Sequence, residues 1–219
     1  MAFLNLFRPQ VNKWCKQVAV SSLHDLHTIL APDVNLTYWQ RPIDTDVEQI
    51  LNQLLYADFQ PLDKMVTWST ADSITETAFA AVSDNELGRK KLTADIIQLT
   101  HEFLRIANTN QARLHLRVVD NDACSRFHTD AYSLRLLCTY VGKATEWVAD
   151  GDVNRNQIWL GTNEEIVPNQ DAIKRLAPFD VAILKGDPNF KSNAGIVHRS
   201  PPIRALGEKR FVLRIDVNE

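Results

Sequence analysis

A change of residue periodicity near position 110 constrains the fold more than any other feature of this 219-residue chain. Before it, apolar residues recur at helical spacing. After it, they alternate with polar residues, as in strands that are buried on one face only. Six of the seven glycines lie beyond residue 140, where a turn-rich β region requires them. The pattern predicts an α+β protein in which a helical portion precedes a β structure.

Two amphipathic helices are predicted between residues 45 and 106. The first begins with a capping box, Thr45-x-x-Glu48, and the second with Ser83-x-x-Glu86. A short helix around 22–30 and a strand around 34–40 precede them. The apolar stripe of the first helix is Val47, Ile50, Leu51, Leu54 and Leu55, and that of the second is Leu92, Ile96, Leu99, Phe103 and Ile106.

The region from Ala112 onward is typical of roughly seven short strands with one short helix, a set that suits a small β-barrel or sandwich flanked by helices. Asn169 is the expected cap of that helix, which ends before Pro178. No Gly/Ser linker separates the two parts, so we expect residues 1–111 to pack on residues 112–219 as one compact unit. The expected strands include 113–119, 125–130, 133–141, 145–148, 179–184 and 210–216.

His128, Asp130 and His198 form the main candidate site. Residues i and i+2 of a strand point to one face, so His128-Thr-Asp130 would direct two metal-ligating groups into the barrel. A later histidine completes a 2-His-1-carboxylate set, which suits non-haem Fe(II) and leaves coordination positions open. The pattern favours a metal centre for oxygen chemistry. The alternative is a chance His-x-Asp pair whose members are only surface or hydrogen-bonding residues.

The order of these segments resembles the double-stranded β-helix of the Fe(II)/2-oxoglutarate-dependent oxygenases, over roughly residues 112–217. The stretches that carry the resemblance are Arg126-Phe-His-Thr-Asp130, Phe179-Asp-Val-Ala-Ile-Leu-Lys-Gly186, Gly195-Ile-Val-His-Arg-Ser-Pro-Pro202 and Arg210-Phe-Val-Leu-Arg214. The resemblance implies a jelly-roll, cupin-like core and an Fe(II) ion held by His128, Asp130 and His198. It also implies a hydroxylase-type dioxygenase with 2-oxoglutarate as co-substrate and a small molecule or a protein side chain as substrate.

By the same resemblance, a basic residue of the last strand binds the far carboxylate of 2-oxoglutarate. Arg210 and Arg214 share one face of that strand, with Phe211, Leu213 and Ile215 on the other. If the apolar face packs on the helices, both arginines line the barrel, and a guanidinium matches a carboxylate in bidentate fashion. Arg210 is the first candidate and Arg214 the second, although the family's usual spacing from the last histidine is slightly shorter. Tyr140 is a weaker candidate for a hydrogen bond to the co-substrate.

Two longer strings resemble a bacterial family of unknown function, the domain-of-unknown-function family number 1826. They are His-Thr-Asp-x-Tyr-Ser-Leu-Arg-Leu-Leu-Cys-Thr-Tyr from His128 and His-Arg-Ser-Pro-Pro from His198. Genes of that family often neighbour zinc-limitation genes, which implies a zinc-binding protein or a zinc-dependent hydrolase as the alternative function. Cys124 could then be a fourth ligand, although a small buried core thiol is more common. A second alternative is a non-catalytic barrel whose three residues are structural.

Charge and composition exclude several classes of partner. Twenty-four basic against 27 acidic residues give a net charge of −3, so binding to nucleic acid is not indicated. The one basic cluster, Arg89-Lys-Lys91, reads as a solvated helix face. No apolar stretch approaches the ~18 residues of a membrane span, and the N-terminal apolar run is too short for a signal peptide. The oligomeric state cannot be inferred.

The remaining candidate residues have ordinary structural readings. The three cysteines, Cys15, Cys124 and Cys138, form no C-x-x-C pair, which favours a reducing compartment, with the cytoplasm expected. Two tryptophans could wall a substrate pocket or pack in the core. Four histidines lack a partner pattern and are expected to be exposed or structural. These tryptophans and histidines are Trp147, Trp159, His24, His27, His101 and His115.

Overall fold

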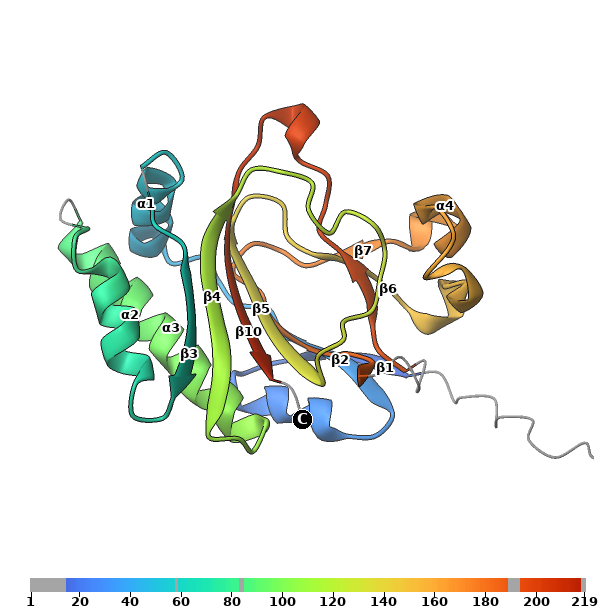
Figure 1. Ribbon diagram of the computed structural model, residues 1–219, viewed down its shortest axis with the longest axis horizontal. Coiled ribbons are helices and arrows are strands. Elements are labelled where there is room, and N and C mark those ends of the chain that lie inside the picture. The colour runs from blue at the N-terminus through green and yellow to red at the C-terminus, as the bar shows by residue number, and fades with distance from the viewer. Residues whose placement is uncertain (1–14, 58, 83–84, 189–193, 218–219) are drawn as a thin grey trace, which may run out of the picture.

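The computed structural model describes residues 15–57, 59–82, 85–188 and 194–217 (Figure 1). A large mixed sheet has helices α1, α2 and α3 on one side, and a small sheet lies beyond its other side. A small pocket, which contains His128 and His198 in its wall, is lined by side chains from both sheets. The α+β class expected from the sequence is therefore confirmed.

The large sheet has the strand order β1-β2-β8-β5-β10-β4-β3, with β1 and β2 parallel and all other neighbours antiparallel. Its strands are β1 (Lys16–Val20), β2 (Val34–Trp39), β3 (Leu62–Thr67), β4 (Gln111–Val119), β5 (Leu134–Val141), β8 (Val181–Lys185) and β10 (Arg210–Val217). β1, β2 and β3 come from the portion that the sequence predicts as mostly helical. The sheet is thus built from both parts of the chain. Of these three early strands, only β2 has a predicted counterpart.

The small sheet places β6 (Glu146–Val148) between β7 (Lys174–Arg175) and β9 (Val197–Arg199). Residues 125–130, expected as a strand, make a single antiparallel bridge, between His128 and His198. The segment from 149 to 173 covers the outer face of this sheet with an apolar cluster of Phe127, Val148, Ile158, Ile166, Val167 and Val197. Its short helices are η2 (Asp150–Asp152), η3 (Arg155–Gln157), α4 (Asn163–Ile166) and η4 (Gln170–Ala172), the last capped by Asn169 as expected.

The helices on the large sheet are η1 (His24–Leu30), α1 (Thr45–Leu54), α2 (Ala71–Phe79) and α3 (Glu86–Ile106). η1, a 3-10 helix, takes the place of the short helix expected at 22–30, and α2 has no predicted counterpart. Every residue of the two predicted apolar stripes is buried. They form one core with the helix-facing residues of the central strands, which include Leu114, Leu116, Leu136, Phe211, Leu213 and Ile215.

The N-terminus of α1 differs from the predicted capping box. Asp44 is the N-cap, and its carboxylate accepts the backbone N–H groups of Asp46 and Val47 at 3.0 and 3.2 Å. Thr45 is already the first helical residue, so the predicted box is wrong by one position. In α3 the N-cap is Asn85; Ser83, the predicted cap, lies outside the described residues.

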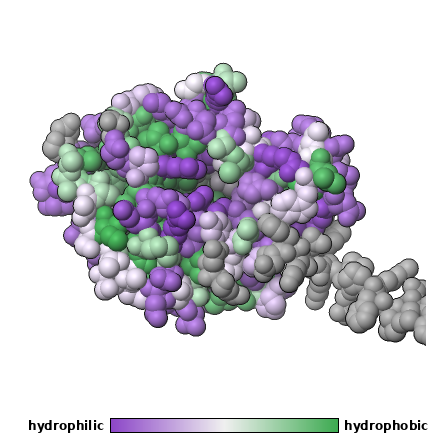
Figure 2. All heavy atoms as spheres, in the orientation of Figure 1, coloured by the Kyte–Doolittle hydropathy of each residue, from purple (hydrophilic) through white to green (hydrophobic). Residues whose placement is uncertain are grey.

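Figure 2 shows hydrophilic side chains over most of one face, with small apolar patches between them. No helix among the described residues is long and apolar enough to cross a membrane. Cys15, Cys124 and Cys138 are all free thiols.

Candidate metal centre and arginine pocket

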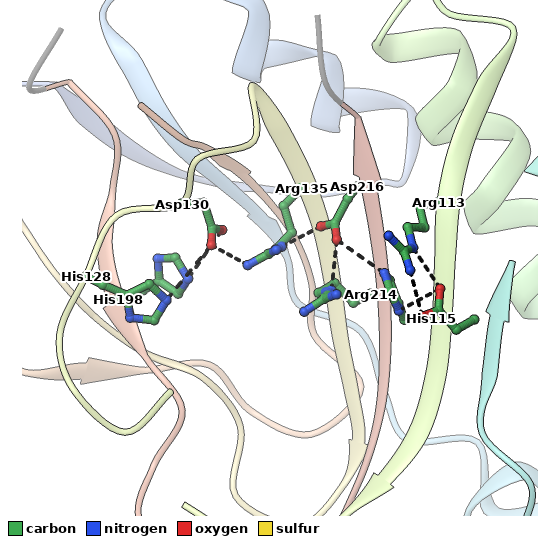
Figure 3. A network of polar contacts seen from close by, with 9 residues as sticks. Arg113, His115, His128, Asp130, Arg135, His198, Arg214 and Asp216 are labelled. Atoms are coloured by element: carbon green, nitrogen blue, oxygen red, sulfur yellow. Dashed lines mark hydrogen bonds and ion pairs between the residues drawn. The ribbon is translucent and has the colours of Figure 1, made fainter. Parts of the chain in front are cut away.

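His128, Asp130 and His198 come together as the sequence pattern predicts, although not through a regular strand (Figure 3). One ligating atom from each residue lies within 4.8 Å of those of the other two. The Nε2 atoms of His128 and His198 lie 3.9 and 3.5 Å from the two carboxylate oxygens of Asp130. Two imidazole nitrogens and one carboxylate oxygen therefore converge on one point.

Backbone contacts hold the three residues in place. The N–H of His128 donates to the carbonyl of His198, and the N–H of His198 donates to that of His128, both at 3.0 Å. Asp130 lies in the loop before β5, where its carbonyl accepts the N–H of Asp187 at 2.7 Å. A Cβ on Gly186 would lie 2.7 Å from the same carbonyl oxygen and 1.8 Å from that of Tyr132. Only glycine permits this close approach, so Gly186 is a site-forming residue that the sequence analysis missed.

Both histidines have a fixed tautomer. Nδ1 of His128 lies 2.7 Å from the carbonyl oxygen of Arg126, and Nδ1 of His198 lies 3.1 Å from that of Ile196. A carbonyl oxygen only accepts, so each Nδ1 carries a proton, and Nε2 is the ring atom of each histidine that could bind a metal. Burial lowers the pKa of His198 to about 4, so this ring is neutral at neutral pH, the form that binds metals.

One carboxylate oxygen of Asp130 is hydrogen-bonded, and the other has no hydrogen-bond partner among the described residues. Oδ1 is paired with the guanidinium of Arg135, whereas Oδ2 is buried without a hydrogen-bond partner in the part of the chain that the structure describes. Burial by itself raises the pKa of Asp130, but the neighbouring His198 and Arg135 outweigh it and lower the pKa. An ionised, buried and unsatisfied oxygen costs free energy unless a cation binds there. The donor set therefore fits Fe(II) or Zn(II).

A narrow pocket of about 60 Å³ adjoins the two histidines. Four arginines line it, from the neighbouring strands β4, β5 and β10, and their side chains leave room for only a few water molecules. Arg210 and Arg214 are both on this face, and Phe211, Leu213 and Ile215 pack toward the helices, as the alternation predicts. The four are Arg117, Arg135, Arg210 and Arg214.

Arg210 differs from Arg135 and Arg214, which both pair with Asp216, because no carboxylate contacts it among the described residues. It is 2 % exposed, its Nη2 donates to Oγ1 of Thr139 at 3.2 Å, and its Nε has no hydrogen-bond partner in the described structure. Burial and the nearby Arg117 lower its pKa to about 10. Arg214, by contrast, has its Nε 2.9 Å from a carboxylate oxygen of Asp216. A buried cation without a counter-ion indicates a place for an anion.

Tyr140 is not in this pocket, so its expected contact with a co-substrate needs correction. It lies on the opposite face of β5, where its hydroxyl donates to Oδ2 of Asp95 on α3 at 2.6 Å and its ring packs against Phe179. The period of two along the strand explains this, since Tyr140 shares a face with Leu136 and Cys138.

The other candidates are placed as follows. Cys124 is exposed and lines the pocket, but it is not among the converging donor atoms. Trp147 is buried in an apolar cluster with Leu137 and Leu184, whereas Trp159 is half exposed. His115, expected to be structural, lies in the polar network of Figure 3, 3.6 Å from Asp216. Arg135 and Asp216, which no local sequence pattern marks as site residues, join that network to Asp130.

Comparison with known proteins identifies the family of the chain and a solved structure with a similar fold. The model of the family described as "Protein of unknown function (DUF1826)" matches residues 21–216. No curated protein matches the sequence. The solved structure of a dioxygenase for auxin oxidation from rice is similar, with a TM-score of 0.55 and 10% identity over 93% of this chain and 83% of that one. At this identity the likeness shows a common fold alone.

A second solved structure, a prolyl-4-hydroxylase from Pseudomonas putida, has a TM-score of 0.45. It is 10% identical over 90% of this chain and 100% of that one. This similarity is too low to support an argument.

Proposed function

The chain belongs to the DUF1826 family, and we propose that it is a non-haem oxygenase that uses Fe(II) and 2-oxoglutarate. One observation carries the proposal: the two histidines of a three-donor candidate metal site line the same pocket as Arg210, a buried arginine that no carboxylate contacts among the described residues. The fold shared with the rice dioxygenase supports it. The substrate would be a small molecule or a protein side chain that approaches this pocket.

The metal would be held by Nε2 of His128, Nε2 of His198 and Oδ2 of Asp130. Three protein ligands leave coordination positions open for reactants, unlike the four of a closed structural zinc site. When bound, Fe(II) and 2-oxoglutarate supply the oxidising chemistry, by activation of O₂ and loss of CO₂ from the co-substrate. The protein contributes the position of the ligands and their protonation states.

Arg210 would bind the far carboxylate of 2-oxoglutarate. Its planar fork can pair with a carboxylate, and the hydroxyl of Thr139 lies beside it as a further donor. Arg214 is the second choice because it already faces Asp216. Since the arginine side chains occupy most of the pocket, we expect their ends to move when the dicarboxylate enters. Leu137 and Val212 give the pocket an apolar wall that limits the access of water.

Anaerobic titration of the purified protein with Fe(II) and then 2-oxoglutarate tests the proposal. We expect the weak visible charge-transfer band of the metal-bound co-substrate, and its loss in His128→Ala. Arg210→Met should weaken 2-oxoglutarate binding at least 30-fold, roughly the loss of one buried charged hydrogen-bond partner, and leave the Fe(II) content unchanged. Arg214→Met is the matched variant, for which we expect a smaller loss.

Three outcomes would contradict this function. Tight stoichiometric zinc without the band would favour the zinc-binding protein or zinc-dependent hydrolase that the sequence resemblance also implies. Binding of neither metal would leave a non-catalytic barrel with a structural triad. Unchanged co-substrate affinity in both arginine variants would show that the cofactor assignment is wrong.

A further inference from the structure

Arg135 links the candidate metal ligand Asp130 to a second buried carboxylate, Asp216 (Figure 3). Its Nη1 contacts Oδ1 of Asp130, and its Nε donates to Oδ1 of Asp216 at 2.6 Å. Arg135 and Asp216 lie directly opposite each other in the antiparallel pairing of β5 with β10. The side chains of Arg135, Asp130 and Asp216 are 8, 7 and 1 % exposed. Water therefore competes little for these contacts.

The two contacts fix the plane of the guanidinium. Arg135 is pre-organised by its rigid fork, and its centre lies 4.8 Å from that of the Tyr132 ring, which supports it from one side. The second oxygen of Asp216 lies 2.9 Å from Nε of Arg214 and 3.6 Å from Nε2 of His115, as ion pairs without a hydrogen bond among the described residues. Asp216, which anchors Arg135, thus belongs to the sheet and not to the loop that carries Asp130.

The arrangement divides the two oxygens of Asp130. Oδ1 is engaged by Arg135 and lies 3.9 Å from Nε2 of His128, whereas Oδ2, 3.5 Å from Nε2 of His198, is buried without a hydrogen-bond partner among the described residues. We propose that Arg135, anchored by Asp216, is a positioning residue that withholds Oδ1 from the metal, so that Asp130 binds through Oδ2 alone. This inference rests on the proposed function only in requiring a metal at the triad.

A purely structural role for Arg135 predicts something different. A buried ion pair contributes little net stability compared with an apolar pair, but removal of one partner leaves the other charge buried and uncompensated. If Arg135 only joined β5 to β10, its removal would change the stability and leave the properties of a bound metal unaltered. A positioning role instead affects the affinity for the metal and the coordination geometry, because groups that orient metal ligands commonly contribute 10- to 100-fold in affinity.

Co(II) is a suitable probe, because its visible absorption reports coordination number and it needs no co-substrate. We expect Arg135→Met to bind Co(II) about 10- to 100-fold more weakly, with an altered visible spectrum because both oxygens of Asp130 become free to ligate. Arg135→Lys should recover part of the affinity, since a lysine restores the charge without the fork. Asp216→Asn should shift affinity and spectrum in the same direction by a smaller amount.

Arg113→Met is the matched control. Arg113 belongs to the far end of the same network, where it pairs with Asp63 at 2.8 Å, and its side chain is 51 % exposed. Its removal should leave the affinity for Co(II) and the spectrum unchanged. Circular dichroism of each metal-free variant verifies that it is folded, and if Arg135→Met does not fold, Arg135→Lys and Asp216→Asn decide the question.

The two proposals fail in distinguishable ways. If the wild type binds Co(II) and folded Arg135 and Asp216 variants match its affinity and spectrum, the positioning role is overturned while the metal centre stands. If the wild-type protein binds neither Co(II) nor Fe(II), the metal centre itself is overturned, and the positioning role with it.

Discussion

Alternate residues of β4, β5 and β10 point to opposite faces of the large sheet, and the two faces differ in kind. The helix-facing set, with Leu114, Leu136 and Phe211, is apolar and fully buried. The pocket-facing set includes four arginines, Arg117, Arg135, Arg210 and Arg214, and one carboxylate, Asp216. Burial of apolar side chains drives folding, whereas burial of charges opposes it unless they are paired. The helix-facing side chains therefore stabilise the protein. The charged side chains of the pocket-facing side have a role only when a metal ion or an anion binds.

Adjacent residues of β10 give the strongest test of that difference. Phe211→Ala removes a fully buried ring from the helix-facing core and should lower the free energy of unfolding by about 3–5 kcal/mol. Arg210→Met replaces an unpaired buried cation with an apolar side chain, so stability should be unchanged or slightly raised. Denaturant unfolding at equilibrium measures both effects.

The effects of the two substitutions on ligand affinity should have the reverse order. The folded fraction of Phe211→Ala should keep the wild-type affinity for Fe(II) and 2-oxoglutarate, whereas Arg210→Met should lose affinity for 2-oxoglutarate. If Arg210→Met destabilised the protein as much as Phe211→Ala does, the pocket-facing side would be part of the stabilising core and the distinction between the two faces would fail.

His115 tests the pocket-facing side through pH. Burial, assisted by Arg214, lowers its pKa from the ordinary 6.5 to about 4. Above pH 6.5 the ring is neutral in both the folded and the unfolded states. As the pH falls from 6.5 to 4, His115 binds a proton in the unfolded state but not in the folded state, so the free energy of unfolding decreases.

Replacement of this histidine should flatten the pH dependence. For metal-free His115→Gln we expect about 1–2 kcal/mol less loss between pH 6.5 and 4 than in the wild type, a value reduced for partial exposure of the ring. Urea unfolding at several pH values measures it. Parallel curves for the two proteins would contradict the buried, neutral state of His115.

The smallest expected effect lies in the helical layer, at the start of α1. Asp44→Ala removes the side chain that accepts the N–H groups of Asp46 and Val47 and should cost about 1 kcal/mol. Thr45→Ala, at the neighbouring position, should change the stability by less than about 0.5 kcal/mol. Both variants should keep wild-type metal binding, and thermal unfolding checks the difference. A larger loss for Thr45→Ala would restore the predicted capping box.

The fold could be predicted where residue periodicity is strong. The stripes of α1 and α3 and the alternation of Arg210, Phe211 and Leu213 depend on local spacing, and the structure has them as expected. β1 and β3 were missed because each lies at an edge of the sheet, where several side chains remain exposed and no clean alternation develops. The contribution of early strands to the sheet follows from long-range pairing, which local spacing does not encode.

The residues of the candidate site also divide into those that local sequence predicts and those that depend on tertiary contacts. His128, Asp130 and His198 could be found because their residue types and order are informative. Tyr140 was misplaced because β5 is almost entirely buried, so its apolar run does not reveal which residues share a face. Arg135 was missed because its role depends on the register that sets it opposite Asp216. Gly186 acts through a contact with a loop more than fifty residues earlier.

The most direct test of the central claim is anomalous diffraction at the iron edge, from crystals grown without oxygen in the presence of Fe(II) and 2-oxoglutarate. We expect one strong peak beside Nε2 of His128, Nε2 of His198 and Oδ2 of Asp130, with the far carboxylate of the dicarboxylate on Arg210. A peak at another position, or no peak at the triad in crystals that contain iron, would contradict the account.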